Sequence, residues 1–184
     1  YHQKCSHRGR QTLSLWGVEL SDPILDLLSR ALQSTYFEQF GLGFNRNFGG
    51  KVIKFALDYL ENNVDCKRFT LHDNTMNNIE DIKRLCEIVR EHPSIKELGL
   101  NGCYISLEMV KAIMKYSRKK LTMLFLGNNS ISTGGDTFIS DFMADDSGLS
   151  SLDLTHNELD DDDAVAIASA LKHNTTLSVL NLTN

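Results

Sequence analysis

The chain has 184 residues, of which 41% are hydrophobic, and its 19 basic and 24 acidic side chains give a net charge of −5. This acidic balance argues against a nucleic-acid partner, because nucleic-acid binding depends on neutralising many phosphates with Lys and Arg. No apolar run approaches the ~20 residues that a membrane-spanning helix needs, so we expect no membrane span.

Residues 1–9 show no periodic pattern, and we expect a disordered or degenerate N-terminal segment there. His2, Cys5 and His7 are metal-ligand types at short spacing, but a zinc site usually needs four ligands in a defined geometry. We therefore predict no metal site in this tract. The chain starts at Tyr1 rather than at Met and stops inside a motif, so we expect it to belong to a longer chain or a larger assembly.

From residue 10 onward one short motif recurs, and its clearest copy is Leu149–Leu159. This copy has leucine at the first, fourth, sixth and eleventh positions and asparagine at the ninth, the pattern of a leucine-rich-repeat strand. The fourth and sixth positions form seven pairs, which are Leu13/Leu15, Phe40/Leu42, Phe69/Leu71, Leu98/Leu100, Leu124/Leu126, Leu152/Leu154 and Leu180/Leu182. Successive pairs recur with a period of about 28 residues, which is typical of long leucine-rich repeats. Residues 10–184 are therefore expected to form one domain of six repeats plus a partial seventh strand.

The ninth motif position carries a residue that can hydrogen-bond where the chain turns out of each strand. From the second repeat onward this residue is Asn45, Asn74, Cys103, Asn129 and Asn157. We expect these side chains to form a ladder between repeats, since an unpaired buried amide costs about 1–3 kcal/mol. Val18 holds the position in the first repeat and cannot serve this purpose, so that repeat is predicted to be degenerate.

Helical periodicity follows each strand motif. In the first repeat the apolar face is predicted to comprise Ile24, Leu27, Leu28 and Ala31. The fifth repeat has the weakest pattern, because an Ala-Asp-Asp-Ser-Gly stretch ends its apolar residues early. A short or irregular helix is therefore predicted within residues 134–148.

Together, the segment Leu149–Leu159, the helix pattern that ends at Leu171 and the pair His173-Asn174 resemble the ribonuclease-inhibitor-like leucine-rich-repeat family. That family includes repeat regions of nucleotide-binding immune receptors, tropomodulins and Ran GTPase-activating proteins. The resemblance covers roughly residues 10 to 184 and implies an α/β solenoid shaped like a horseshoe. A parallel sheet is expected on its concave side and helices on its convex side. The resemblance indicates architecture rather than function.

The concave sheet is expected to expose the third, fifth, seventh and eighth positions of each motif, since side chains alternate across a strand. Several of these positions are glycines, which we expect to leave the sheet open to a partner. The predicted partner-binding residues are Trp16, Phe44, Arg68, His72, Asn101, Met123, Phe125, Asp153 and His156. For Trp16 and Phe44 an alternative is that they pack against an N-terminal cap or a flanking domain.

We expect a protein-interaction scaffold rather than an enzyme, with no catalytic residues, cofactor or metal. No nucleophile, base and orienting residue converge in the motifs, and the Gly-x-Gly of Phe40–Phe44 lies in a strand rather than before a helix. The run Asp160–Asp163 is interpreted as carboxylates at a helix N-terminus. Cys66, Cys86 and Cys103 fall at core positions, which suits a reducing compartment, and the cytoplasm is the expected location.

Two other functions stay open at this point. The resemblance to Ran GTPase-activating proteins allows a GTPase-activating role, acting from loops that leave the strands. Asn45–Asn47 and Asn128–Asn129 lie in such loops. The chain is alternatively the sensing or autoinhibitory repeat region of a larger receptor.

Overall fold

The computed structural model describes residues 11–44, 49–145 and 147–183. The predicted degenerate segment 1–9, with His2, Cys5 and His7, lies outside these ranges. The strands are β1 (Thr12–Trp16), β2 (Gln39–Gly43), β3 (Arg68–Thr70), β4 (Glu97–Gly99), β5 (Met123–Phe125), β6 (Ser151–Asp153) and β7 (Val179–Asn181). The helices are α1 (Asp22–Ala31), the 3-10 turn η1 (Leu32–Ser34), α2 (Gly49–Asn62), α3 (Ile79–Glu91), α4 (Leu107–Ser117), α5 (Phe138–Ala144) and α6 (Asp161–Leu171).

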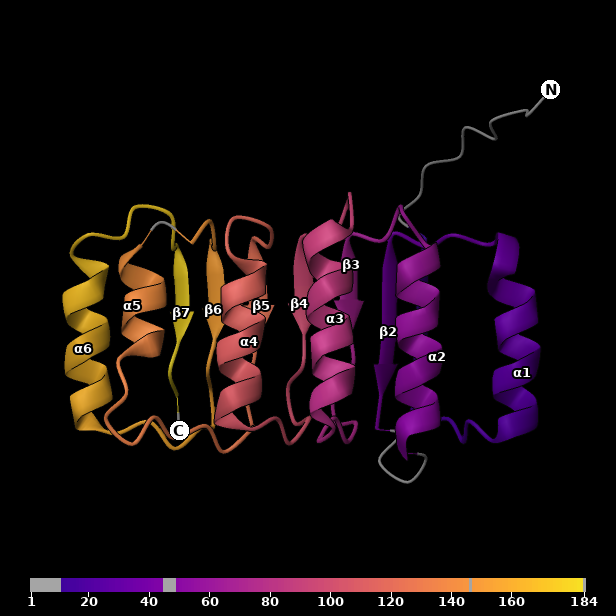
Figure 1. Cartoon of the computed structure of the whole chain (residues 1–184), viewed down its shortest axis with the longest axis horizontal. Helices are drawn as coiled ribbons and strands as arrows, with labels where there is room; N and C mark the ends of the chain where they lie inside the picture. The colour runs from indigo at the N-terminus through magenta and orange to yellow at the C-terminus, as the bar shows by residue number, and fades with distance from the viewer. Residues whose placement is uncertain (1–10, 45–48, 146, 184) are drawn as a thin grey trace.

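The strands form one sheet in chain order, and every neighbouring pair is parallel. The helices form a second layer in front of the sheet, and Figure 1 shows that the row of helices is longer than the row of strands. This difference is expected, because neighbouring strands lie ~4.8 Å apart whereas packed helices lie ~8–10 Å apart. The solenoid therefore curves with its strands on the concave side, which confirms the predicted architecture.

The register of the sheet places the fourth motif positions side by side. Leu13 pairs with Phe40, Phe40 with Phe69, and the same column continues through Leu98, Leu124, Leu152 and Leu180. Five of these side chains, from Phe40 to Leu152, are at most 1% exposed. The leucine pairs in the sequence therefore identified the core of the array correctly.

The predicted asparagine ladder is present where strands turn into loops. The side-chain amide of Asn157 donates to the carbonyls of Leu126 and Leu154, which belong to successive repeats. Its carbonyl oxygen accepts from the backbone N–H groups of Asn129 and Ile131. This side chain thus links two turns of the chain through both of its polar atoms.

The apolar face of α1 differs from the prediction. Leu25 is buried and Leu28 is partly buried, but Leu27 is 62% exposed and Ile24 is 39% exposed. The reason is positional, because α1 contacts a neighbouring helix on one side only, where α2 lies (Figure 1). The sequence pattern included the side chains on the uncovered side of the helix together with those facing the core.

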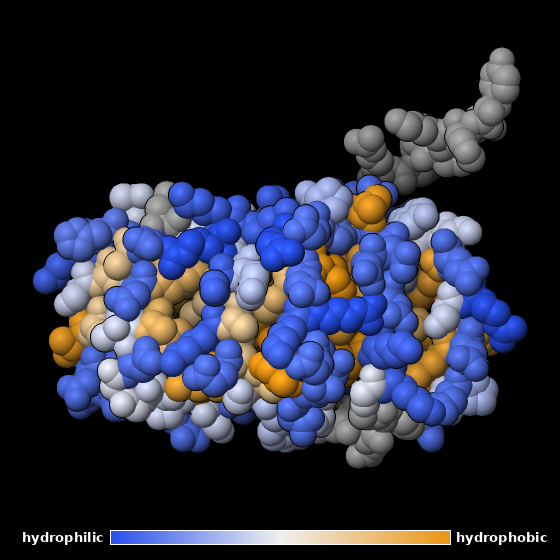
Figure 2. Space-filling model, viewed as in Figure 1, coloured by the Kyte–Doolittle hydropathy of each residue, from blue (hydrophilic) through white to orange (hydrophobic). Residues whose placement is uncertain are grey.

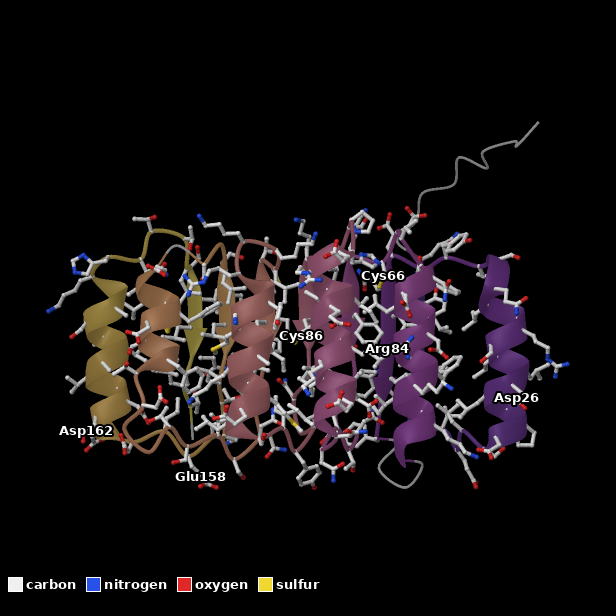
Figure 3. The ribbon with its side chains drawn as sticks, in the orientation of Figure 1. Asp26, Cys66, Arg84, Cys86, Glu158 and Asp162 are labelled. Atoms are coloured by element: carbon white, nitrogen blue, oxygen red, sulfur yellow. The ribbon has the colours of Figure 1, made fainter. Side chains whose placement is uncertain are left out.

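The helix of the fifth repeat is short, as predicted, since α5 has 7 residues. The convex face is largely hydrophilic along the helices, with apolar side chains visible between them (Figure 2). Arg84 lies between α2 and α3 (Figure 3), where its guanidinium contacts Asp58 at 2.7 Å and Glu61 at 2.5 Å. None of the described helices is both long and apolar enough to cross a bilayer.

His92 follows α3 and is 4% exposed. Its Nδ1 accepts from the backbone N–H groups of Ser94 and Ile95, and its Nε2 lies 2.9 Å from the carbonyl oxygen of Asn63. The ring is therefore held as the neutral tautomer that carries its proton on Nε2. Burial lowers the pKa of His92 below its ordinary value of 6.5.

We expect His92→Asn to reduce the loss of stability on acidification. The unfolded chain takes up a proton at His92 as the pH falls below about 6.5, whereas the folded chain resists it, so stability falls with pH in that range. Asparagine is a matched replacement, because its side-chain oxygen can accept the same two hydrogen bonds. Oδ1 of Asn174 accepts from the backbone N–H groups two and three residues later, at Thr176 and Leu177, as Nδ1 of His92 does. Melting temperatures measured between pH 7.5 and 5.5 check this, with exposed His173→Asn as the control. An equal pH dependence in both variants would contradict it.

Candidate functional site

The indole ring of Trp16 lies flat across the neighbouring strand β2. A Cβ atom added to Gly43 would sit 2.6 Å from two atoms of the six-membered ring, and one added to Gly41 would sit 3.4 Å from the indole nitrogen. One face of the ring therefore rests on a strand that carries no side chain beneath it. The side chain of Trp16 is nonetheless exposed, because its other face is directed away from the sheet.

Two further rings surround the indole and complete what we call the aromatic cluster (Trp16, Phe44 and His72). The ring centroid of Phe44 lies 5.6 Å from that of Trp16 at an interplanar angle of 56°. The ring of His72 lies 5.7 Å from it at 52°. Trp16 is 43% exposed and Phe44 is 58% exposed, so the cluster presents apolar rings to solvent on the concave side.

His72 is fixed by the neighbouring strand. Its Nδ1 accepts from the backbone N–H of Asn101 at 3.1 Å, and its ring lies over Gly99, where an added Cβ would approach Cε1 to 2.5 Å. Burial lowers the pKa of His72, and the carboxylates of Asp73 and Asp153 oppose this effect in part. The ring is therefore neutral near pH 7, with its remaining proton on Nε2.

The concave glycines serve a different purpose from the one expected. Besides Gly43 under Trp16 and Gly99 under His72, Gly127 lies under Thr155, whose Oγ1 would be 2.6 Å from an added Cβ. Each of these glycines is covered by a side chain from an adjacent repeat. The expectation that glycines leave the sheet open is therefore wrong for Gly43, Gly99 and Gly127, whereas an added Cβ at Gly17 would have nothing within 4 Å.

The eighth motif position has a left-handed backbone in every described repeat, a feature that sequence reasoning missed. The φ angles are +61° at Gly17, +58° at Phe44, +55° at Asp73, +66° at Gly102, +56° at Asn128 and +50° at His156. Glycine, asparagine and aspartate adopt this conformation readily, whereas a bulky aromatic residue is strained in it. The feature of the sequence that indicates a left-handed backbone here is the glycine at this position in the first and fourth repeats, Gly17 and Gly102.

We expect Phe44→Gly to leave the free energy of unfolding unchanged or to raise it by up to about 1 kcal/mol. The left-handed backbone disfavours Phe by roughly 1–2 kcal/mol, and glycine removes that cost while adding some chain entropy to the unfolded state. The exposed ring contributes little burial in return. Urea unfolding monitored by circular dichroism checks this, and Phe44→Ala, which keeps the strain, is the matched control. A loss of about 2 kcal/mol or more in Phe44→Gly, beyond what one aromatic pair contributes, would show that the ring is structural.

The side chains of the other predicted site residues make contacts outside the aromatic cluster, although the backbone N–H of Asn101 donates to His72. Nε of Arg68 on β3 forms an ion pair with the carboxylate of Glu97 on β4. Asn101 accepts from the N–H of Gly127 at 2.8 Å through its Oδ1. Both side chains are thus engaged in contacts between repeats.

The second half of the sheet carries the remaining predicted residues. Met123, Phe125 and Asp153 are half-buried, and His156 is exposed. Oδ1 of Asp153 accepts from the backbone N–H of Thr155 at 3.0 Å. The structure therefore brings together three of the nine predicted residues and spreads the others along the sheet. Exposed Tyr104, at φ +57°, was not predicted.

The segments that suggested other chemistry have local structural roles. Oδ1 of Asp160 accepts from the N–H of Asp163, and Oδ2 of Asp163 accepts from the N–H of Asp160. These two hydrogen bonds cap the N-terminus of α6, where Asp162 is labelled in Figure 3. Asn129 is buried in the ladder, and Asn45–Asn47 lie outside the described residues. Within the described part of the chain, no His, Cys, Asp or Glu side chains gather as a metal site.

The parallel one-layer sheet, the return helices and the ladder define a leucine-rich-repeat solenoid. A structure of actin-binding site 2 of leiomodin-1 shares this fold with a TM-score of 0.62, 20% identity, and coverage of 72% of this chain and 80% of that chain. An internalin from Listeria monocytogenes str. 4b F2365 has a TM-score of 0.52 and 17% identity, over 95% of this chain and 48% of that chain. No protein-family model and no curated protein sequence matches the chain.

Proposed function

We propose that the chain is a protein-interaction scaffold that binds another protein through its concave sheet and the adjoining loops. The observation that carries this proposal is the aromatic cluster, because Trp16 and Phe44 expose large rings on a surface that nothing in the described chain covers. Tryptophan is among the residue types most enriched at binding hot spots. The strained backbone of Phe44 adds support, since strain of this kind is concentrated at functional sites.

The role that we propose is binding without a catalytic step. The fold holds its side chains on a stiff parallel sheet, which favours recognition of a folded partner or a bound segment. The thiols of Cys66 and Cys86 are buried, and burial raises the pKa of each to about 12. Such unreactive, unpaired thiols fit the reducing compartment in which we place the protein. Membership of the ribonuclease-inhibitor-like subclass also belongs to this proposal, supported by a repeat length of about 28 residues, at the long end for leucine-rich repeats.

Actin is the first partner to test, because the similar leiomodin-1 structure is that of an actin-binding site. Binding of labelled chain to actin is measured by fluorescence anisotropy, and any other captured partner is measured in the same way. We expect Trp16→Ala with Phe44→Gly to weaken the complex at least about tenfold, as for a hot spot. Leu27→Ala with Val165→Ala removes exposed apolar side chains from helices α1 and α6 and should leave binding unchanged.

Unchanged binding by the concave double variant would overturn the proposal. If a flanking domain covers Trp16 and Phe44 instead, the double variant will lower the melting temperature of the longer chain without affecting its partner. The described residues do not support the GTPase-activating alternative. Asn129, which was considered for that role, uses its side-chain amide to donate to three backbone carbonyls of the ladder. Stimulated GTP hydrolysis by a small GTPase would restore it.

A further inference from the structure

A cavity of about 250 Å³ lies between the C-terminal ends of helices α2 and α3, and we call it the α2–α3 cavity. Its walls include Glu61 and Val64 at and after the end of α2, and Arg84, Glu87 and Ile88 on α3. Arg84 is labelled between these two helices in Figure 3. Sites for drug-sized ligands have volumes of ~300–1,000 Å³, so the size of this cavity suits one long side chain. The cavity belongs to the layer of helices and is separate from the aromatic cluster.

Part of the lining is apolar. The side chains of Val64 and Pro93 are exposed and that of Ile88 is buried, so a side chain that enters the cavity meets aliphatic groups. His92 also borders the cavity. Its ring is neutral near pH 7, because burial lowers its pKa and both ring nitrogens are held by backbone groups. The ring therefore adds no positive charge to the lining.

The arginine that lines the cavity is surrounded by acidic groups. The guanidinium of Arg84 contacts the carboxylates of Asp58 and Glu61. Burial raises the pKa of Asp81, and the charge of Arg84 acts against this rise, so a third carboxylate lies near the same guanidinium. One positive charge thus serves three carboxylates.

The carboxylates of Glu87 and Glu91 share a second arginine. Nε of Arg90 contacts Glu91 at 2.7 Å, whereas Glu87 acts on Arg90 more weakly and forms no ion pair with any described residue. Lys120 is a further cation nearby, because its charge adds to burial in lowering the pKa of His92. The charged lining residues and the groups that interact with them are therefore three cations and five carboxylates, namely Arg84, Arg90 and Lys120 against Asp58, Glu61, Asp81, Glu87 and Glu91. A surplus of negative charge remains when all these interactions are counted.

The ends of the two helices add to this negative charge. Helices α2 and α3 run in the same direction and end at the same edge of the molecule (Figure 1). The last carbonyl groups of a helix carry a partial negative charge, which favours a cation near that end. Glu61 lies in the last turn of α2 and Glu91 is the last residue of α3, so carboxylates and helix ends act in the same sense.

We propose that the α2–α3 cavity binds an Arg or Lys side chain presented by a protein partner. The methylene groups of such a side chain pack on Val64 and Pro93 while its charge lies among the carboxylates, whereas a neutral side chain gains the apolar contact alone. Arginine is favoured over lysine, because a guanidinium can bond two carboxylates at once, as that of Arg84 does. This proposal goes beyond the proposed function, since it gives the layer of helices a binding surface of its own.

The experiment follows the methyl resonances of Val64 and Ile88 in 1H–13C spectra at low salt, where charge interactions are least screened. The probes are N-acetyl-argininamide and N-acetyl-citrullinamide, which has nearly the same shape but a neutral urea in place of the guanidinium. We expect saturable shifts with the arginine probe and about threefold weaker binding of the citrulline probe, as for the loss of one partly exposed ion pair. Equal binding of the two probes, or no saturable shift of these methyl groups, would overturn the proposal.

Variants of Glu87 test the role of charge, because this side chain is exposed and its replacement should not disturb the fold. Glu87→Gln should weaken the arginine probe about twofold and leave the citrulline probe unchanged. Glu87→Lys places a cation in the cavity and should weaken the arginine probe at least about fivefold, since it replaces attraction by repulsion. Glu158→Gln is the matched control, because it changes the net charge as Glu87→Gln does but lies at the edge where the helices begin (Figure 3). Unchanged binding of the arginine probe to Glu87→Lys would contradict the proposal.

The proposal is tested independently of the proposed function. The concave double variant, Trp16→Ala with Phe44→Gly, leaves the α2–α3 cavity in place, so it should bind the arginine probe as tightly as the unaltered chain. Loss of probe binding in that variant would show that the probe occupies the concave sheet, and would overturn the assignment to this cavity. A partner complex that Glu87→Lys weakens at least about fivefold, and that Glu158→Gln leaves unchanged, would support the role of the cavity in partner binding. An unchanged complex in Glu87→Lys would show that the partner does not use the cavity, contrary to the proposal.

Discussion

Replacing Asn129 by alanine should lower the free energy of unfolding by about 3–5 kcal/mol, because it strips several buried backbone groups of their partners. Asn129 is 7% exposed. Its side-chain nitrogen donates to the carbonyls of Leu100 and Leu126 at 2.9 Å and of Gly127 at 3.1 Å. Its oxygen accepts from the N–H groups of Cys103 at 2.9 Å and Ile105 at 3.4 Å.

Chemical unfolding followed by circular dichroism measures this effect. The matched control is Asn128→Gly, next door in sequence but exposed, where glycine tolerates the φ of +56° and the change should stay within about 0.5 kcal/mol. Asn129→Cys should fall between the two. Sγ of Cys103 at the same position donates to the Leu71 carbonyl, but a thiol replaces only part of an amide. Equal stabilities for the alanine and glycine variants would show that the ladder is not a source of stability.

A second large effect is expected from Phe40→Ala, which should cost about 3–5 kcal/mol through lost burial and an unfilled cavity. Phe40 is 1% exposed on β2. Its ring stacks with Tyr59 at 4.5 Å and with Phe69 at 5.6 Å, and it lies 6.3 Å from the ring of Phe55. This aromatic group fills the space that leucines fill in later repeats.

Phe40→Leu is the matched control, because leucine stands at the equivalent position in β4, β5 and β6. It should cost less than half as much as alanine, about 1–1.5 kcal/mol, since it leaves a smaller cavity. Thermal and urea unfolding of both variants measure the difference. A cost for Phe40→Ala below about 1 kcal/mol, far under the usual range for a buried Phe, would mean that β2 is loosely packed, contrary to its burial.

The positions of the strands were predictable because every strand carries the same repeated sequence motif. A leucine pair at alternate positions, repeated with a period of about 28 residues, places the core residues of all repeats in one column. The ladder followed from the same alignment, since Asn is required where polar backbone groups are buried. The inward face of α1 was not predictable in this way. Its apolar stripe includes Leu27 on the uncovered side, and only the absence of a preceding helix in the described chain explains that exposure.

The candidate site was only partly predictable. Trp16, Phe44 and His72 were identified as concave residues from their motif positions. That their rings meet depends on how far each side chain leans over the next strand, and an alignment of repeats contains no such information. The left-handed backbone at Phe44 was also missed, because a bulky residue at that position hides the preference that glycine reveals elsewhere.

The seating of Trp16 on Gly43 has a consequence for protein engineering. A substitution that gives Gly43 a side chain displaces an indole that belongs to the preceding repeat, since the added atom would meet the ring at 2.6 Å. The smallest unit that can be transplanted is therefore the directly paired residues Trp16 and Gly43 on two neighbouring repeats, rather than a single repeat. A chimaera that carries the tryptophan to another array without its glycine will tilt the ring off the sheet and dismantle the surface it was meant to transfer.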